Sequence, residues 1–172
     1  EDFESTPVSV YRRGEGLGNA IRWTVEFGFD YFRTLSSELV LLGEYGHNDI
    51  PKNLILSTDG GRTFDVIKTT PDNGNGINSH WHDVEIDKYT GHIWASQGDL
   101  ENSAVFLSRD LGLTWHTIDV TPRRQPTLIM SFPDRILLGR DSSEVTPGVD
   151  YIIKPKTSDG WDNLEIKELA SF

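Results

Sequence analysis

Four side chains able to do acid–base chemistry fall within one short stretch. Residues 43–49 read Gly-Glu-Tyr-Gly-His-Asn-Asp, so Glu44, Tyr45, His47 and Asp49 combine two carboxylates with a phenol and an imidazole. Carboxylates and imidazoles are common general acids and bases, and the two glycines give the backbone room to approach a ligand. The stretch therefore predicts part of a polar ligand site.

A pair of histidines follows in residues 79–83, which read Ser-His-Trp-His-Asp. On a β-strand His80 and His82 point to the same face, because the side-chain period is two. Three roles fit such a pair: one ring packs while the other faces solvent, both bind polar groups of a sugar, or both ligate a divalent cation. The sequence leaves these roles open, and a divalent cation is the cofactor that it allows.

Two further acids follow the ends of later strands, at positions that match that of Glu44. Asp99 and Asp141 each follow a glycine-containing strand end, in Gly-Asp and Gly-Arg-Asp. One interpretation is a ring of ligand-binding acids, and the other is that these residues only form turns. Arg124 lies at the entry to a later group of strands, at the position that matches His80 and His82 in the group before it. It offers a cation to an anionic sugar.

The elements that must position these residues are marked by an internal repeat. The pattern Ser-x-Asp-x-Gly-x-Thr-aromatic occurs twice, 51 residues apart, which is typical of stacked similar units. In each copy we expect the Asp to accept hydrogen bonds from turn N–H groups, the Gly to adopt positive φ, and the aromatic ring to be buried. The members are Ser57, Asp59, Gly61, Thr63 and Phe64, and Ser108, Asp110, Gly112, Thr114 and Trp115.

The two copies resemble the Asp-box, or bacterial neuraminidase repeat, of sialidase-like β-propellers. The stretch 32–64 is similar to the first blade of a sialidase, which implies that Arg33 binds a substrate carboxylate and that Asp49 is the general acid/base. Glu44 is the second candidate catalytic carboxylate. The chain departs from the sialidase pattern because Thr-Leu follows Arg33 in place of Ile-Pro.

Turn residues divide the chain into short strand-like segments, and no long amphipathic helix is evident. We expect one all-β unit over 1–172, built from four-stranded antiparallel blades at about 30–68, 80–120 and 126–169. In the third blade the box has decayed to 157–161. Propellers have four to eight blades, so three imply a segment of a larger propeller, completed by remaining blades or by self-association. The expected strands are 7–11, Arg22–Phe27, 31–35, 38–45, Asn53–Ser57, 63–68, 81–87, 92–97, Ala104–Ser108, 114–120, 126–132, Arg135–Arg140, 150–154 and 163–169.

The composition of the chain argues against some classes of binding partner and metal site. The formal net charge is −11, with 27 acidic and 16 basic residues, which argues against a nucleic-acid partner. No stretch of about 20 apolar residues exists, so no membrane span is expected. The chain has no cysteine and hence no thiolate metal site.

Two functions remain. The first is a carbohydrate-directed propeller that binds a glycan or polysaccharide, or acts on one as a relative of glycoside hydrolases or polysaccharide lyases. The alternative is a non-catalytic structural or adhesion module, such as a segment of a viral or cell-surface spike. Either one predicts an extracellular or surface-exposed protein.

Overall fold

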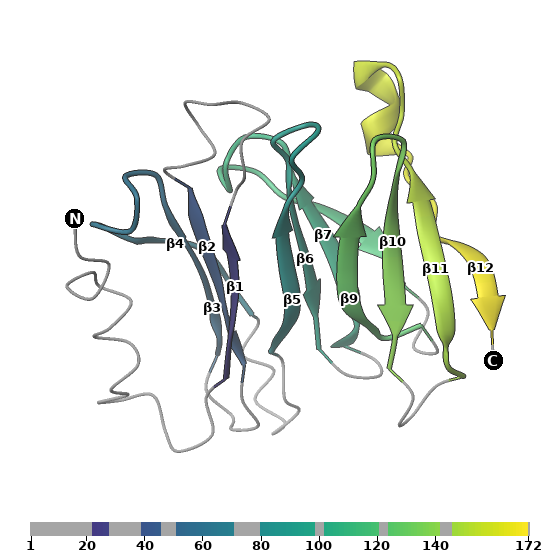
Figure 1. Cartoon of the computed structure of the whole chain (residues 1–172), viewed down its shortest axis with the longest axis horizontal. Coiled ribbons are helices and arrows are strands. Elements are labelled where there is room, and N and C mark those ends of the chain that lie inside the picture. The colour runs from purple at the N-terminus through teal and green to yellow at the C-terminus, as the bar shows by residue number, and fades with distance from the viewer. Residues whose placement is uncertain are drawn as a thin grey trace.

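The chain folds into three antiparallel sheets of four strands each, arranged in a row (Figure 1). Within the described part of the chain there is no α-helix, and no helix is long and apolar enough to cross a membrane. The all-β prediction is therefore confirmed. The computed structural model describes residues 22–27, 39–45, 51–70, 80–98, 102–120, 124–141 and 146–171.

Each sheet uses four strands that are consecutive in the chain. The first sheet contains β1 (Arg22–Phe27), β2 (Val40–Tyr45), β3 (Asn53–Ser57) and β4 (Asp65–Thr69). The second contains β5 (Trp81–Ile86), β6 (Ile93–Gln97), β7 (Ala104–Ser108) and β8 (His116–Asp119). The third contains β9 (Pro126–Ser131), β10 (Arg135–Arg140), β11 (Gly148–Ile153) and β12 (Lys167–Ser171).

The described strands agree with the predicted bounds within two residues, except at the start of β12, and the start of the first sheet differs from the predicted blade. The first strand of the first sheet is Arg22–Phe27, so this sheet begins earlier than the expected range 30–68; residues 7–11 and 31–35 lie outside the described residues. Strand β12 begins at Lys167 and not at residue 163. The reason is a 3-10 helix, Ser158–Asp162, which takes the place of the decayed third box and buries Trp161.

Apolar side chains between neighbouring sheets form the core. The middle strands of the first and second sheets (β2, β3, β6 and β7) are buried along almost their whole length, because both of their faces are covered. Leu41 and Leu54 of the first sheet pack against Trp81, Val84 and Phe106 of the second. The second interface buries another cluster, whose members are Trp94, Val105, Leu107, Ile118, Ile129, Ile136, Leu138, Ile152 and Trp161.

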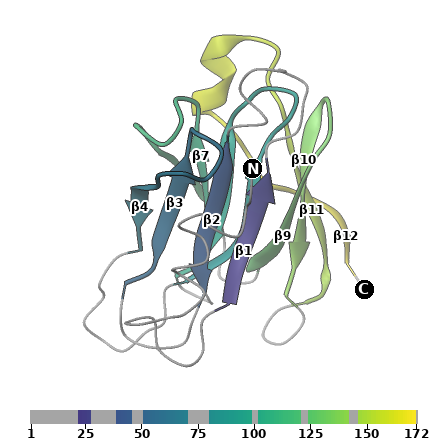
Figure 2. The same ribbon diagram turned by 60° about the vertical axis from the view of Figure 1, so that its left-hand side comes forward.

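The sheets are oriented so that equivalent strand ends meet. The first residue of β1, β5 and β9 pairs with the last residue of β2, β6 and β10: Arg22 with Tyr45, Trp81 with Gln97, and Pro126 with Arg140. We call this end of the molecule the polar end; it is the lower end in Figure 1. Figure 2 shows β1 and β9 in the middle, with the last strands β4 and β12 far out on either side.

The repeated loops lie at the opposite end, where β3 turns into β4 and β7 into β8. We call residues 57–64 and 108–115 the repeat loops. In the first, Ser57 Oγ accepts from Gly61 N (2.8 Å), and Asp59 Oδ1 accepts from Thr63 N (2.9 Å). The second repeats both bonds at 2.8 Å, from Gly112 N to Ser108 Oγ and from Thr114 N to Asp110 Oδ1.

The expected features of the loops are present, with one correction. Gly61 (φ 84°) and Gly112 (φ 89°) have positive φ, as predicted. Phe64 and Trp115 are only partly buried, because both loops are at the surface. The two rings also differ in their contacts: Phe64 packs on Val40, Leu42 and Ile55, whereas Trp115 Nε1 donates to the carbonyl of Ile67 in the neighbouring sheet (3.1 Å).

Candidate functional site

Three aromatic side chains with polar atoms cluster at the polar end. Tyr45 ends β2, His80 directly precedes β5, and His82 lies at a register shift near the start of β5. The ring centroids of His80 and His82 are 4.7 Å apart, and those of Tyr45 and His80 are 4.2 Å apart. Tyr45 and His82 are 6.3 Å apart. We call these three residues the ring cluster. It confirms that both histidines lie on one side of the strand.

The ring cluster connects all three sheets. His82 Nδ1 lies 3.1 Å from the backbone oxygen of Pro126, the first residue of β9. Because a carbonyl only accepts, Nδ1 carries the proton, and in the neutral ring Nε2 is the acceptor. The backbone carbonyl of His80 accepts from Gly98 N, directly after β6 (2.8 Å). The ring cluster is therefore bonded both to the end of β6 in the second sheet and to β9 of the third sheet. His80 is fully buried and His82 is 7% exposed.

Glu44 is adjacent to Tyr45 in the chain, but its carboxylate has a structural partner. Glu44 Oε2 accepts from the backbone N–H of Asn53 at 2.6 Å, and the residue is 4% exposed. This bond fixes the start of β3 against the end of β2. The structure therefore places the carboxylate on its own sheet rather than beside the histidines.

Arg124 is near the polar end, and its charge is compensated. Its guanidinium contacts Asp150, a fully buried carboxylate on β11. Arg140 binds the same carboxylate through Nε (2.9 Å) and donates to Glu168 of β12 (2.7 Å). The hydrogen bonds that Arg140 donates to Asp150 raise the pKa of Arg140 above its ordinary value. These two arginines and two acids have no net charge and stabilise the third sheet.

Asp141 is paired with a residue in an unusual conformation. Gln125 Nε2 donates to Asp141 Oδ2 (3.2 Å), and Asp141 N donates to the Gln125 carbonyl (3.0 Å). Gln125 has φ 27°, in the left-handed region that side chains rarely adopt. Gln125 precedes Pro126, which contacts His82, so the pair with Asp141 fixes the backbone that orients the ring cluster.

Sequence reasoning missed a row of carboxylates on β5. Asp83 Oδ2 accepts from Ile129 N (2.7 Å), and Glu85 Oε1 accepts from Ser131 N (2.9 Å). The two acids thus satisfy the edge of β9 where no strand pairs with it. Burial raises the pKa of both carboxyls, and hydrogen bonds from Ile129 N to Asp83 and from the Ser131 side chain and N–H to Glu85 partly offset the rise. Their spacing of two residues, shared with Asp87, was the available signal.

Asp87, directly after β5, forms a buried ion pair with Lys154. Asp87 Oδ2 lies 2.6 Å from Lys154 Nζ, and the side chains are 0% and 4% exposed. The same carboxylate accepts from Tyr89 N (3.0 Å) and from the Thr90 hydroxyl. The pair links the second sheet to the third, away from the polar end. No sequence spacing predicts it, because 67 residues separate the partners.

The remaining predicted residues are not placed. Arg33, His47, Asp49 and Asp99 lie outside the described residues. Among the residues that are described, no group of three His, Asp or Glu side chains is close enough to hold a metal ion. The His80–His82 pair therefore has no third ligand within that part of the chain.

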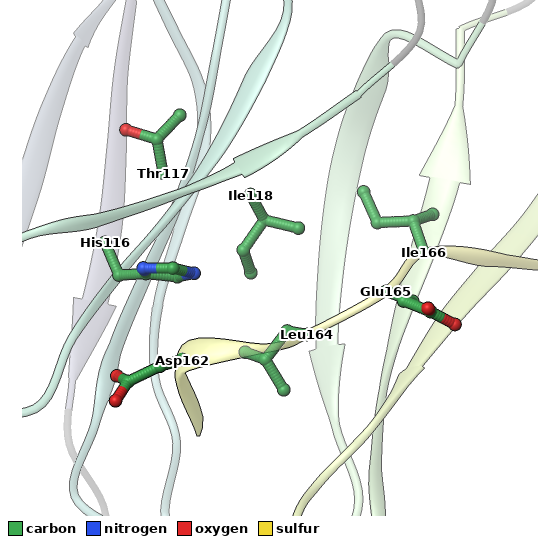
Figure 3. A pocket seen from close by; sticks show the side chains of 7 residues that line it. All are labelled: His116, Thr117, Ile118, Asp162, Leu164, Glu165 and Ile166. Atoms are coloured by element: carbon green, nitrogen blue, oxygen red, sulfur yellow. The ribbon is translucent and has the colours of Figure 1, made fainter. Parts of the chain in front are cut away.

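A pocket lies elsewhere, between strand β8 and the segment that leads into β12. Its volume is about 480 Å³. Figure 3 shows Ile118 and Leu164 in the space between the two elements, with His116 and Asp162 on one side. Nothing in the sequence singled out these residues, because the pocket forms between segments about 45 residues apart and depends on how the second and third sheets pack.

Comparison with known proteins identifies no family. No protein-family profile matches the chain, and no curated protein matches it in sequence. Among solved structures, it is similar to an α-L-arabinofuranosidase, Arb93A, from Fusarium graminearum in complex with an iminosugar inhibitor. The TM-score is 0.40 at 16% identity, over 91% of this chain and 55% of the other. The chain thus spans about half of that protein, and a likeness of this size assigns no activity.

Proposed function

We propose that this chain is a segment of a β-propeller that binds a glycan at its polar end. The ring cluster carries the proposal: a phenol and two imidazoles within 6.3 Å of one another, at the point where three sheets meet. Sugars are bound by aromatic faces together with hydrogen-bonding groups, and such groups collect in concave, largely preformed sites. The four-stranded sheets and the repeat loops support the propeller architecture.

Binding fits the described residues better than catalysis does. Glu44 holds the backbone of Asn53, and Asp141 accepts from Gln125. A glycosidase needs one carboxylate as acid and another as base or nucleophile. The roles of Asp49 as general acid/base and Arg33 as carboxylate ligand stay proposals that rest on the sialidase resemblance.

The charge around the ring cluster favours a neutral sugar over an acidic one. Arg124 is the described cation closest in sequence to Pro126, and Asp150 already neutralises it. A sugar carboxylate would have to compete with this buried ion pair, whereas hydroxyl groups need only the Tyr45 phenol and the His82 imidazole, since His80 is fully buried. Since glycans of this kind coat cells and matrices, we propose an extracellular or surface-exposed location.

A glycan array with neutral and acidic structures tests the function. The native chain should be retained on neutral glycans, and isothermal titration with lactose and 3′-sialyllactose should show whether an added acidic sugar weakens binding. Tyr45→Phe and His82→Gln should each weaken binding about tenfold, the loss of one hydrogen bond. Ser108→Ala, in a repeat loop, is the matched control and should bind as the native chain does.

The outcomes separate the two functions. Retention on no glycan at all contradicts the proposal and favours the structural or adhesion module. Release of reducing sugar from a bound glycan would show that an acid outside the ring cluster makes the protein an enzyme. Because His80 is fully buried, the double variant His80→Ala/His82→Ala is informative only if circular dichroism shows the native β signal.

A further inference from the structure

One face of the third sheet is apolar and has no neighbour among the described residues. The face toward the second sheet is buried, with Ile136, Leu138 and Ile152 fully buried. The opposite face carries Leu128, 49% exposed, and Met130, 45% exposed. We call this opposite face of β9–β12 the open face. It lies at the end of the row of sheets in Figure 1.

The strand register extends the open face across three strands. Met130 pairs with Leu137, and Leu137 pairs with Tyr151. Leu137 and Tyr151 are partly buried, and Ile153, two residues after Tyr151, is 54% exposed. Because paired residues of an antiparallel sheet share a face, these side chains form one contiguous apolar surface. Surfaces of this kind mark interaction sites on proteins.

The open face has the same pattern of residues as the faces of the first and second sheets that pack against the next sheet. In the first sheet, Leu41 and Gly43 of β2 lie against the second sheet. A Cβ on Gly43 would come within 2.9 Å of Trp81 Cβ, so the small residue admits the neighbouring strand. By register, Trp94 and Ser96 of β6 occupy the equivalent positions.

The same positions in the third sheet are Leu137 and Gly139 of β10. A large apolar residue followed two positions later by a small one is thus present in all three sheets. Leu41 and Trp94 are completely buried by the next sheet, while Leu137 remains partly exposed. The geometry therefore indicates that another sheet packs on the open face.

Charge makes a second copy of this chain a suitable occupant. The chain has a net charge of −11, so two copies repel each other over most of their surface. On β9, β10 and β11 the only acid is Asp150, which lies on the face toward the second sheet and is bound by Arg124, just before β9, and by Arg140 of β10. The open face of these strands thus carries Arg135, which pairs with Asp134 of the adjoining turn, and its lack of net charge lets two copies approach there with little repulsion.

We propose that two copies of the chain associate through the open face, with their β9–β12 sheets packed face to face about a twofold axis. Twofold pairing is the commonest symmetry of homo-oligomers. It brings the exposed side chains Leu128, Met130 and Ile153 of one copy against the same face of the other. Four strands of about six residues give a face of roughly 19 by 20 Å, which is small among protein interfaces. The dimer is therefore weak, with a dissociation constant on the order of 10–100 µM.

Sedimentation velocity of the native chain from about 5 to about 500 µM tests the proposal across that range. The sedimentation coefficient should rise from the monomer value to the dimer value. Met130→Glu and Leu137→Glu should shift the midpoint at least tenfold to higher concentration, because the twofold brings like charges together. Leu113→Glu, at a site 85% exposed in a repeat loop, should leave the midpoint unchanged.

Mixing Met130→Glu with Met130→Lys provides a positive test, since opposite charges at the interface should restore the dimer. A native chain that stays monomeric at about 500 µM, above the affinity range of weak interfaces, overturns the proposal. So does a Met130→Glu variant that dimerises like Leu113→Glu. Either result would leave a further blade of the propeller as the occupant of the open face. Glycan binding at the polar end is measured separately and does not depend on this outcome.

Discussion

The repeat loops and the polar end use similar polar residues in opposite ways. In the first repeat loop, Asp59 and Ser57 bind groups no more than four residues away. At the polar end, His82 contacts Pro126, 44 residues away, and Arg124 contacts Asp150, 26 residues away. Each repeat loop therefore makes its hydrogen bonds within itself and has the same structure wherever its sequence occurs. The polar end, by contrast, forms only when the sheets pack together.

This contrast has a functional consequence. The serine and aspartate side chains of the repeat loops bind groups of their own turn, so the repeated loop pattern is structural. Side chains brought together from separate sheets have fixed positions and diverse chemistry, which a ligand site requires. The most regular part of the sequence is thus the part least involved in binding.

The largest expected effect comes from Asp150, which joins β11 to Arg124 and Arg140. Asp150→Ala leaves two guanidinium groups without their carboxylate, one of them on Arg140, which is 5% exposed. We expect a loss of about 3–5 kcal/mol in the free energy of unfolding, measured by urea denaturation. Asp134→Ala is the control, because Asp134 pairs with its exposed neighbour Arg135 and should show no measurable change.

The next effect concerns the serine hydroxyls of the repeat loops. Ser57→Ala and Ser108→Ala each leave buried N–H groups without an acceptor, and we expect each to cost about 1–3 kcal/mol in urea denaturation. Ser131→Ala is the matched control, because Ser131 Oγ is also buried but accepts from no backbone N–H among the described residues. If Ser57→Ala were as stable as Ser131→Ala, the loop would not depend on this bond.

A smaller effect distinguishes the two repeat loops from each other. Gly60 has φ 74° in the first loop, whereas Leu111 has φ 57° at the same position of the second. The left-handed conformation costs a non-glycine residue about 1–2 kcal/mol. Leu111→Gly should therefore raise the free energy of unfolding by up to about 1 kcal/mol, part of the gain being lost to the greater freedom of glycine in the unfolded chain. Gly60→Ala should lower it by a similar amount; a change of the opposite sign in either variant would contradict this account.

The smallest effect is a difference in pH dependence. Burial raises the pKa of Asp83 and Glu85, so the folded state binds protons more tightly and stability falls as pH rises from about 4 through the raised pKa. Hydrogen bonds from Thr63 lower the pKa of Asp59, so its stabilisation is complete above about pH 4 and is lost on acidification. Thermal melts of Asp83→Asn and Asp59→Asn against pH should differ from the native curve with opposite slopes. Equal slopes would show that the two carboxylates are in similar environments.

Much of the fold was predictable because its signals are local. Strands Asn53–Ser57, Ala104–Ser108 and Arg135–Arg140 have the predicted bounds, since each alternates or runs apolar between turn residues. The repeat loops were predictable to the level of single hydrogen bonds, because all of their partners lie within the pattern. The 3-10 helix at Ser158–Asp162 was not, because its Trp161 is fixed by burial against the second sheet rather than by the turn residues around it.

The sequence by itself determined the all-β class, the repeat loops and the proximity of His80 to His82, since these follow from side-chain period and turn chemistry over a few residues. Only the tertiary structure decided that Tyr45 joins the histidines, that Asp150 neutralises Arg124, and that Asp83 satisfies the edge of β9. Those contacts join residues 26 to 46 positions apart across strands or sheets. Their geometry comes from packing, and no spacing within one strand encodes it.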